Sequence, residues 1–374
     1  APYIEGKSGY VVVLAGDTPL IRAESLEAMI EYTIEGDYSA VALSTIVEDS
    51  TGYGRIVRAA DGDFAKIVEH RDATDAERAI KEINASMYCF RIDSLIESLK
   101  GLANDNAQRE YYLTDTLSII KDKGEKVGVY CLDDYTEILG INTREQLNDA
   151  ERFMRRRINK SHMDNGVTLI DPESTYIGPD VTIGEDTIIY PGNVLEGSTD
   201  IGQDCILYPN NRIVDSTLGN GVESESAVIL ESVIDFGVNI GPFAYIRPGS
   251  HIGKDAKIGD FVEVKNSHIG EGTKISHLAY VGDASVGQNV NIGCGVIFVN
   301  YDGHVKHRTD VGDNSFVGCN VNLVAPVTVG DNTFIAAGST ITEDVPEGAL
   351  GIARAKQVNQ DGWVSDRRQR KSQK

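Results

Sequence analysis

The residues best suited to chemistry in this chain are a histidine and a few cations in its C-terminal half. His277 stands in the run Ser276-His-Leu-Ala-Tyr280, and an imidazole titrates near neutral pH, so it can take a proton from an amine. Arg247, which precedes a proline, and Lys265 can hold phosphate oxygens, arginine as a planar fork and lysine as a point charge. Taken singly, each of these residues is better explained as a solvated surface group.

Charge and composition limit the classes of partner. The chain has 374 residues, 41% of them hydrophobic, and a formal net charge of −22, so two domains of an ordinary globular protein are expected. Such an acidic surface repels nucleic acid and anionic membranes, and we expect neither as a partner. A phosphate-bearing substrate would need local lysines and arginines to overcome this field, which makes those cations informative.

Cysteine usage and hydropathy favour a cytoplasmic protein. The five cysteines are Cys89, Cys131, Cys205, Cys294 and Cys319. They are odd in number and contain no Cys-x-x-Cys pair, so they indicate reduced thiols, and neither a disulfide framework nor a zinc site. No apolar run reaches the ~18 residues of a membrane span, and residues 1–9 lack the pattern of a signal peptide. We expect a cytoplasmic location without membrane insertion.

An aliphatic residue recurs at every sixth position of the C-terminal half. It does so in three registers: Ile177, Ile183, Ile189, Leu195, Ile201, Leu207 and Ile213; Ile240, Ile246, Ile252, Ile258 and Val264; Val311, Val317, Leu323, Val329, Ile335 and Ile341. A period of six fits neither an amphipathic helix nor a half-buried strand. It is typical of short parallel strands joined by tight turns, with one aliphatic side chain per hexad inside a narrow three-sided prism. The pattern predicts a parallel β-helix of roughly nine coils.

The repeat lapses between Gly295 and Val311. This stretch contains Asn300-Tyr-Asp-Gly-His-Val-Lys-His-Arg-Thr309, which is polar, aromatic and basic. A loop ejected from a regular solenoid is where function is usually placed. We therefore expect this loop to belong to the functional site.

The N-terminal part alternates between strand and helix patterns. Strands are expected at residues 10–15, 40–47, 85–90 and 127–132, and helices at 23–34, 115–122 and 143–159. The alternation indicates an α/β sheet, whose ligands gather at the carboxyl ends of the strands. After Pro346 a tail follows, and its residues 354–374 hold seven Lys and Arg against two Asp, opposite in sign to the whole chain.

Several runs of residues together resemble one bacterial enzyme family. They are Leu14-Ala-Gly-Asp-Thr-Pro-Leu20, Thr51-Gly-Tyr-Gly-Arg-Ile56, Ile67-Val-Glu-His70, Glu82-Ile-Asn84, Asn289-Val-Asn-Ile-Gly293, Asn300-Tyr-Asp-Gly303 and Leu323-Val-Ala-Pro-Val-Thr-Val-Gly330. Over essentially its whole length the chain resembles the bacterial bifunctional N-acetylglucosamine-1-phosphate uridyltransferase/glucosamine-1-phosphate N-acetyltransferase. That family acetylates glucosamine 1-phosphate with acetyl-CoA and then, with Mg²⁺, transfers uridyl from UTP to give UDP-N-acetylglucosamine for cell-wall precursors.

The resemblance implies a fold and an assembly. The fold class is α/β plus all-β: an incomplete Rossmann-like nucleotidyltransferase domain followed by a left-handed parallel β-helix of hexapeptide repeats. The implied domains are the C-terminal part of a uridyltransferase at 1–142, a helical linker at 143–165, the acetyltransferase β-helix at 166–345 and a tail at 346–374. Three copies are expected to form a homotrimer with acetyltransferase sites between subunits.

Residue roles in acetyl transfer follow from the same resemblance. It implies His277 as general base and Glu263 as the carboxylate that orients its imidazole. The implied contacts to the amino-sugar phosphate are Arg247, Lys265, Tyr280, Asn291, Asn300, Tyr301 and Lys306, and those to acetyl-CoA are Cys294, Cys319, Ala337 and Arg354. The better known form of the family has Ala in place of Cys294 and Ser in place of Cys319. Because a thiol is a weaker donor than a hydroxyl, we expect Cys319 to line the thioester site; an acyl-enzyme formed on a cysteine is the less favoured alternative.

For uridyl transfer, the resemblance implies Gly54, Glu69 and Asn84 as sugar contacts and Asp17 and Asn142 as Mg²⁺ ligands. The family's first strand and its Gly-rich loop with Arg and Lys, which hold the nucleotide triphosphate, have no counterpart in residues 1–16. We therefore expect little or no uridyltransferase activity from this chain.

Two functions of other classes stay open at this point. A β-helix that serves only as an oligomerisation or regulatory module of a sugar nucleotidyltransferase predicts no base and no ejected basic loop. A metal-dependent β-helix hydratase needs three histidine ligands. His251, His268, His277, His304 and His307 are available, but their spacing does not build one shared zinc site.

Overall fold

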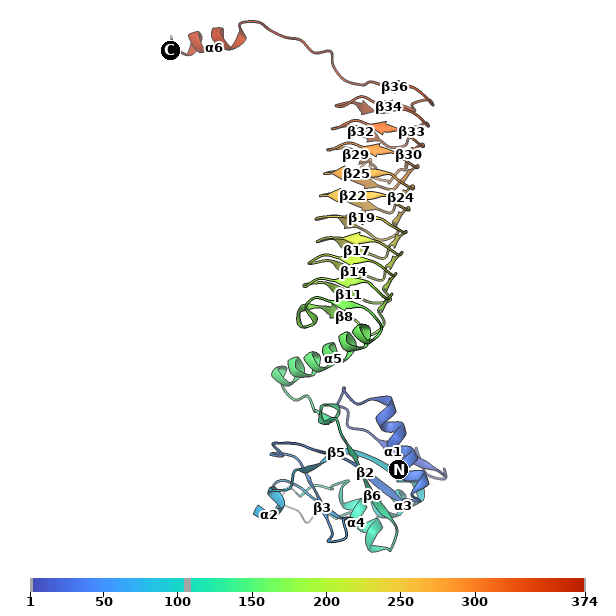
Figure 1. Cartoon of the computed structure of the whole chain (residues 1–374), viewed down its shortest axis with the longest axis vertical. Coiled ribbons are helices and arrows are strands. Elements are labelled where there is room, and N and C mark those ends of the chain that lie inside the picture. Colours follow the sequence, from blue (N-terminus) through green and yellow to red (C-terminus); the bar gives the residue numbers. More distant parts are fainter. Residues whose placement is uncertain (1–2, 104–108, 373–374) are drawn as a thin grey trace. The chain divides into compact units, whose positions relative to one another are not determined.

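The computed structural model describes residues 3–103 and 109–372 (Figure 1). The chain divides into two compact units, Ala1–Met154 and Arg155–Lys374. The long helix α5, Arg144–Asp164, contains the boundary between them. Among the described residues, no helix combines the length and the apolar character needed to cross a bilayer.

The first unit is a mixed sheet with helices on both faces. Its strands are β1 Tyr10–Val13, β2 Ala40–Ile46, β3 Arg55–Arg58, β4 Phe64–Val68, β5 Glu82–Arg91 and β6 Val127–Leu132, and its helices are α1 Ala23–Glu35, α2 Asp75–Arg78, α3 Ile92–Leu99 and α4 Asp115–Asp122. The strand order is β4-β3-β5-β2-β6, with β1 paired to β5. Only the β2–β6 pair is parallel among the described strands of this sheet.

Burial along β2 explains why the strand lies at the centre. Successive side chains of a strand point to opposite faces, so Ala40 and Ala42 pack with Leu117 of α4 in one cluster. Val41 and Leu43 pack with Met29 of α1 in another. A strand covered on both faces must be apolar throughout, which is why its sequence was readable as a buried strand. The strands β3 and β4 and the helices α2 and α3 were not expected from the sequence.

The second unit is a β-helix made of three parallel sheets, whose coils are stacked in Figure 1. The first sheet contains β7 Thr168–Leu169, β10 Ile188–Ile189, β13 Ile206–Leu207, β16 Glu223–Ser224, β19 Asn239–Ile240, β22 Lys257–Asp260, β25 Lys274–His277, β28 Asn291–Ile292, β31 Phe316–Val317, β34 Phe334–Ile335 and β36 Leu350–Gly351. The second contains β8 Tyr176–Ile177, β11 Val194–Glu196, β14 Arg212–Val214, β17 Val228–Leu230, β20 Tyr245–Ile246, β23 Glu263–Lys265, β26 Tyr280–Gly282, β29 Ile297–Val299, β32 Asn322–Val324 and β35 Thr340–Ile341. The third contains β9 Thr182–Ile183, β12 Asp200–Ile201, β15 Thr217–Leu218, β18 Val233–Ile234, β21 His251–Ile252, β24 His268–Ile269, β27 Ala284–Val286, β30 Thr309–Val311 and β33 Val327–Val329.

The chain passes through the three sheets in the same order in every coil. We call the turn from the first to the second sheet corner 1–2 and the turn from the second to the third sheet corner 2–3. The described sheets hold 11, 10 and 9 strands, close to the nine coils expected. After the β-helix, the helix α6, Trp363–Ser372, lies in the exposed tail. The predicted fold class, a Rossmann-like domain followed by a left-handed parallel β-helix, is confirmed.

The expected aliphatic registers form the interior of the prism. The central side chains, such as Ile213 and Ile258, are fully buried in one continuous cluster that runs from Val167 to Val345. Each coil has three sides, and a side normally spans six residues from one inward side chain to the next. The registers break where a side spans only five residues. Leu195 pairs with Ile213, 18 positions on, whereas Ile213 pairs with Ile229, only 16 positions on. The stack of inward-pointing side chains therefore continues without a gap, even where the six-residue spacing is lost in the sequence.

Burial predicts unequal costs for two adjacent residues of β18. Ile234 points inward and is 1% exposed, whereas Val233 points outward and is 45% exposed. Ile234→Ala is expected to destabilise the β-helix by about 2–5 kcal/mol, because it leaves a cavity in a closely packed interior. Val233→Ala, the control on the same strand, is expected to change stability by no more than about 0.5 kcal/mol. Thermal unfolding followed by the circular dichroism of the β-strands measures both; equal shifts would contradict the assigned orientation.

Candidate active site

Corner 2–3 brings together the polar residues that the sequence scatters. This corner takes most of the length changes of the β-helix: the side from Ile246 to Ile252 has six steps and the side from Val264 to Ile269 has five. The expected loop emerges at the same corner, between β29 and β30, where the coil lengthens to 25 residues. The break in the repeat is therefore an insertion into one corner, which leaves the ladders on either side intact.

The inserted loop is a small hairpin held by its own polar groups. Tyr301 and Lys306 form an antiparallel bridge, and the His307 N–H donates to the carbonyl of Asn300 at 2.9 Å. Asp302 accepts from the backbone N–H groups of residues 304 and 305 at 2.7 Å, and its Oδ2 lies 2.8 Å from His307 Nε2. These bonds hold the pKa of Asp302 below its usual value. These bonds order the hairpin that carries Lys306.

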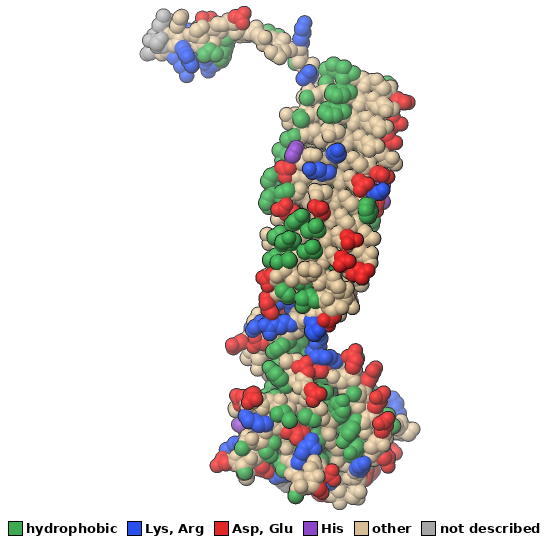
Figure 2. Space-filling view, in the orientation of Figure 1, with side chains coloured by type: hydrophobic (Ala, Val, Ile, Leu, Met, Phe, Trp, Pro, Cys, Tyr) green, Lys and Arg blue, Asp and Glu red, His purple; other side chains and the backbone are tan. Residues whose placement is uncertain are grey.

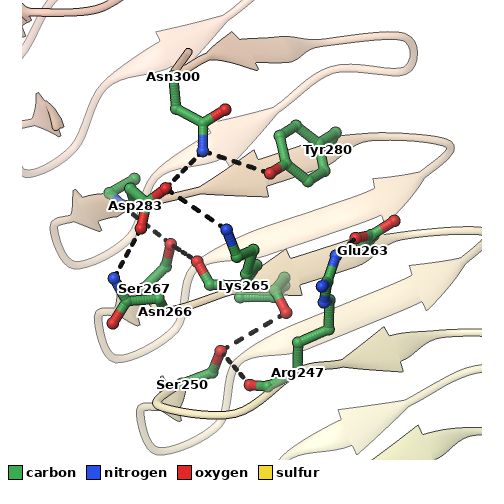
Figure 3. Close-up of polar contacts among 11 residues, drawn as sticks. Arg247, Ser250, Glu263, Lys265, Asn266, Ser267, Tyr280, Asp283 and Asn300 are labelled. Carbon is green, nitrogen blue, oxygen red and sulfur yellow. Dashed lines mark hydrogen bonds and ion pairs between the residues drawn. The ribbon is translucent and has the colours of Figure 1, made fainter. Parts of the chain in front are cut away.

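Asp283 is the centre of the cluster at this corner (Figure 3). Its carboxylate accepts from Asn266 Nδ2 and from Asn300 Nδ2, both at 2.6 Å, and lies 3.8 Å from Lys265 Nζ. Asn300 Nδ2 also donates to Tyr280 Oη at 3.3 Å. Side chains of the preceding coil and of the loop in the following coil therefore converge on one carboxylate that is 7% exposed.

Electrostatics at the cluster favour an anion outside it. Burial alone would raise the pKa of Asp283, but the bonds from Asn266 and Asn300 and the charges of Lys265 and Lys306 outweigh burial and hold this pKa below its usual value. The ammonium group of Lys265 lowers the pKa of Lys306. A bound anion such as a phosphate would favour the charged form of Lys306 beside Lys265. Figure 2 shows acidic side chains on the visible face of the β-helix, and an anion would need local cations to overcome their charge.

Arg247 and Glu263 pair with each other on the same sheet. Arg247 Nη1 donates to Glu263 Oε1 at 2.8 Å, and the guanidinium lies over the Tyr245 ring, 5.6 Å from its centroid (Figure 3). The bond to Glu263 raises the pKa of Arg247. Glu263 was expected to orient the imidazole of His277. In the structure it is the partner of Arg247 instead.

The imidazole of His277 is held by Asp260, a residue that sequence reasoning missed. His277 lies at corner 1–2, and its Nδ1 is 2.7 Å from Asp260 Oδ1, one coil before it. The bond to His277 lowers the pKa of Asp260. In the tautomer that donates its Nδ1 proton to Asp260, the exposed ring keeps a lone pair on Nε2. No pattern in the sequence distinguished Asp260 from an ordinary turn aspartate.

The residues expected at acetyl-CoA form a row along corner 1–2. His277, Cys294, Cys319 and Ala337 occupy the same place in four consecutive coils, because the ladder joins residues 278 to 295, 294 to 320 and 319 to 338 by backbone hydrogen bonds. Arg354 reaches the end of the row and donates from Nη1 to the Ala337 carbonyl at 3.0 Å.

Two expected contacts lie apart from these groups. Asn291 is on β28 of the first sheet, next to Lys274 and Phe316, and so faces away from the Asp283 cluster. Tyr301 is exposed at the loop, where its hydroxyl donates to the Gly303 carbonyl at 2.7 Å.

The first unit carries the other expected residues around cavities of its own. Asp17, Asn84 and Asn142 line one cavity of about 300 Å³. Gly140 separates the two expected metal ligands: a Cβ there would lie 3.2 Å from Asp17 Oδ2 and 3.9 Å from Asn142 Nδ2. One carboxylate and one amide around a polar cavity fit Mg²⁺, which takes few protein ligands and keeps the rest for phosphate and water.

Gly54 and Glu69 are also neighbours in this unit. A Cβ at Gly54 would lie 3.4 Å from both Glu69 carboxylate oxygens, and the Asn84 N–H donates to the Gly54 carbonyl at 2.9 Å. Burial, and then the nearby Asp72 and Asp115, raise the pKa of Glu69. Gly54, Glu69 and Asn84 come from three separate sequence motifs, and the fold brings them together.

Histidines do not form a metal site in the described part of the chain. Residues 3–103 and 109–372 contain no group of three His, Cys, Asp or Glu side chains placed to hold a metal ion. His251 and His268 lie edge-to-face on the third sheet, where His251 Nε2 contacts Asp235 Oδ2 at 2.9 Å. The hydratase alternative therefore lacks its three-histidine centre among these residues.

Comparison with known proteins gives close relatives. Residues 231–266 and 308–343 match the family described as bacterial transferase hexapeptide (six repeats). The chain is 55% identical over 362 residues to the "Bifunctional protein GlmU" of Clostridium botulinum (strain ATCC 19397 / Type A), covering 97% of this chain and 79% of that protein. It is 58% identical over 363 residues to the protein of the same name from Alkaliphilus oremlandii (strain OhILAs), with the same coverage of each.

The lowered pKa of Asp283 predicts a loss of stability in acid. A carboxyl group whose pKa is lower in the folded state contributes stability above its unfolded pKa and loses that contribution as pH falls through the folded value, here below about pH 4. Asp283→Asn is expected to lower stability at neutral pH by about 1–3 kcal/mol and to make the decline in acid shallower. Unfolding temperatures at neutral and acid pH measure this. Asp310→Asn, which removes an exposed carboxylate of β30, is the control, and an unchanged acid decline in Asp283→Asn would contradict the assignment.

Proposed function

The chain belongs to the family of the bifunctional GlmU proteins, and we propose that it transfers the acetyl group of acetyl-CoA to the amine of glucosamine 1-phosphate. The observation that carries this proposal is that the β-helix holds His277 by Nδ1 against Asp260 at one border of the second sheet and gathers Lys265 around Asp283 at the other. Amide formation at an amino sugar phosphate needs both groups, whereas a β-helix that only assembles subunits needs neither.

The imidazole supplies the base. Nε2 of His277 takes the proton of the substrate ammonium group, the amine attacks the thioester carbonyl, and the new C–N bond replaces the C–S bond as coenzyme A leaves with its thiol protonated. Asp260 holds Nδ1–H and stabilises the imidazolium that forms. His277 is the catalytic residue in this proposal and Asp260 is a positioning residue.

The lysines and their neighbours hold the sugar phosphate. Lys265 and Lys306 bind phosphate oxygens, and Arg247 adds a fork when the substrate competes with Glu263 for its guanidinium. Tyr280, Asn291, Asn300 and Tyr301 are proposed as hydrogen-bonding partners of the sugar. Asp283 keeps Asn300 and Lys265 in place.

Acetyl-CoA is proposed to lie along corner 1–2 beside Cys294, Cys319, Ala337 and Arg354. The row leads from the imidazole to the last coils of the β-helix, so the thioester lies near His277 while the rest of the coenzyme follows the corner. Arg354 and the basic tail supply the positive charge that coenzyme phosphates need on an acidic protein.

A homotrimer is proposed as the working assembly. Phe243, Phe261 and Leu278 stack along corner 1–2 with 58–59% of their surface exposed and with positive φ angles. Phe243 and Phe261 lie with ring centroids 5.4 Å apart. A row of large apolar side chains next to a catalytic imidazole is the kind of surface that a second copy covers. Because His277 and Lys265 lie at opposite borders of the second sheet, neighbouring chains would complete each site.

The family's second reaction is proposed for a domain at 1–142, which lies within the first unit. Residues 143–165 are proposed to connect it to the β-helix at 166–345 and the tail at 346–374. Gly54, Glu69 and Asn84 would hold the acetylated sugar, and Asp17 and Asn142 a Mg²⁺ that supplies charge stabilisation to the phosphates. Asp17→Ala is then expected to leave acetyl transfer intact. Pyrophosphate release from UTP and N-acetylglucosamine 1-phosphate measures uridyl transfer by this chain.

Replacing the base should abolish most acetyl transfer. His277→Ala is expected to lower kcat by about 10²–10⁴-fold, because the ammonium proton then has no acceptor. His268→Ala, on the third sheet, is the control and should retain activity. Acetylated product is measured by mass spectrometry. Full activity in His277→Ala would end the assignment of the base and favour the purely structural β-helix.

Replacing the lysines should weaken binding of the sugar phosphate. Lys265→Ala or Lys306→Ala is expected to raise KM for glucosamine 1-phosphate by roughly 10-fold or more, since a hydrogen bond to a charged group contributes about 1.5–3 kcal/mol. KM for acetyl-CoA should change little. Lys274→Ala, on the first sheet, is the matched control. An equal loss for unphosphorylated glucosamine would show that the lysines do not act on the phosphate.

A further inference from the structure

Two exposed thiols occupy equivalent places in consecutive coils. Cys294 and Cys319 directly follow the glycines that end the paired strands β28 and β31, whose register joins Asn291 to Phe316 and Ile292 to Val317. The Asn320 N–H donates to the Cys294 carbonyl, and the Gly293 N–H to the Val317 carbonyl, both at 2.8 Å. These bonds align the two cysteines at the same position of neighbouring coils.

Glycines let the two coils approach closely at this corner. A Cβ at Gly293 would lie 2.7 Å from the backbone nitrogen of Cys319, and one at Gly318 would lie 2.6 Å from that of Ala337. Adjacent strands are spaced about 4.8 Å apart. A disulfide needs Cα atoms about 4.4–6.8 Å apart. The register therefore places the two cysteines within the span that a disulfide bridges.

The other three cysteines are either buried or have no exposed cysteine at the equivalent position of a neighbouring strand. Cys89 and Cys205 are buried, and Cys131 is exposed on β6 of the first unit, away from Cys294 and Cys319 in the sheet topology. Of the five, only Cys294 and Cys319 combine exposure with equivalent ladder positions. They also continue the row that starts at His277.

We propose that Cys294 and Cys319 form a vicinal dithiol that closes to an intramolecular disulfide by exchange with a small-molecule disulfide. One thiolate attacks the reagent and releases its first thiol, which leaves a mixed disulfide on the protein. The second cysteine then attacks the modified sulfur, forms the Cys294–Cys319 bond and releases the second thiol. The two cysteines lose two electrons and two protons, and the reagent gains them.

Closure has a consequence that rests on the proposed function. The thioester of acetyl-CoA is proposed to lie along this corner, so a disulfide there replaces two thiol groups of its binding surface with a rigid bridge next to His277. Acetyl transfer should therefore stop in the oxidised molecules and return when a dithiol reductant opens the bridge.

The experiment treats the full chain with oxidised glutathione and reads out the intact mass, the cross-linked peptides and the activity. The expected product is a molecule that has lost two hydrogens and gives a Cys294–Cys319 linked peptide. Its residual activity should equal the fraction of molecules left without the bridge. Cys131→Ser, the matched control with another exposed cysteine removed, should form the same linked peptide.

The variants separate the pair from its single members. Cys294→Ser and Cys319→Ser should each trap a mixed disulfide on the remaining cysteine. The double variant Cys294→Ala/Cys319→Ser should have the same activity before and after treatment with oxidised glutathione. Stable mixed disulfides on both cysteines of the unaltered chain, without the linked peptide, would overturn the proposal. If the chain shows no acetyl transfer at all, the proposed function fails, while the linked peptide still decides the dithiol.

Discussion

The backbone ladder between coils is the constraint on which the rest of the β-helix depends. Each coil donates and accepts at fixed positions along the next, so a residue lies directly above its counterpart 16 to 18 positions earlier, or 25 positions earlier where the loop is inserted. Inward positions then become an aliphatic stack, and corner positions become columns of side chains. Asp260, His277, Cys294 and Cys319 share a column only because the ladder aligns four coils. Register therefore arranges the column that contains His277, whereas the inserted loop contributes Asn300 and Lys306.

The sequence predicted most of this arrangement and missed its details for identifiable reasons. Ile177 to Ile213 and Val311 to Ile341 keep six-residue steps, so their burial could be foreseen. Leu218 and Ile269 are just as buried, but they follow five-residue steps and fell between the detected registers. A single shortened side changes the phase of the pattern without disturbing the interior, which no fixed period can detect.

The candidate site shows the same division. The motifs brought His277, Lys265 and Asn300 into view, but not Asp283 or Asp260, because a turn aspartate in an acidic chain has no distinguishing spacing. Their importance comes from what surrounds them: Asp283 receives two amides at 2.6 Å, and Asp260 receives an imidazole at 2.7 Å. Glu263 was expected at His277, yet Arg247 is the partner one coil away on the same sheet. In the first unit, β3 and β4 escaped prediction because short strands at a sheet edge lack the unbroken apolar run of β2.

Corner 2–3 takes most of the missing residues of the short coils and the nine-residue excursion that carries Lys306, while the ladders above and below keep their pairing. Additions and deletions there change what the molecule presents to a small anion without altering a single inward side chain. Such a corner separates the part of the molecule that can diverge from the part that must stay constant. The hairpin can therefore change in length or sequence while the inward rows keep their register.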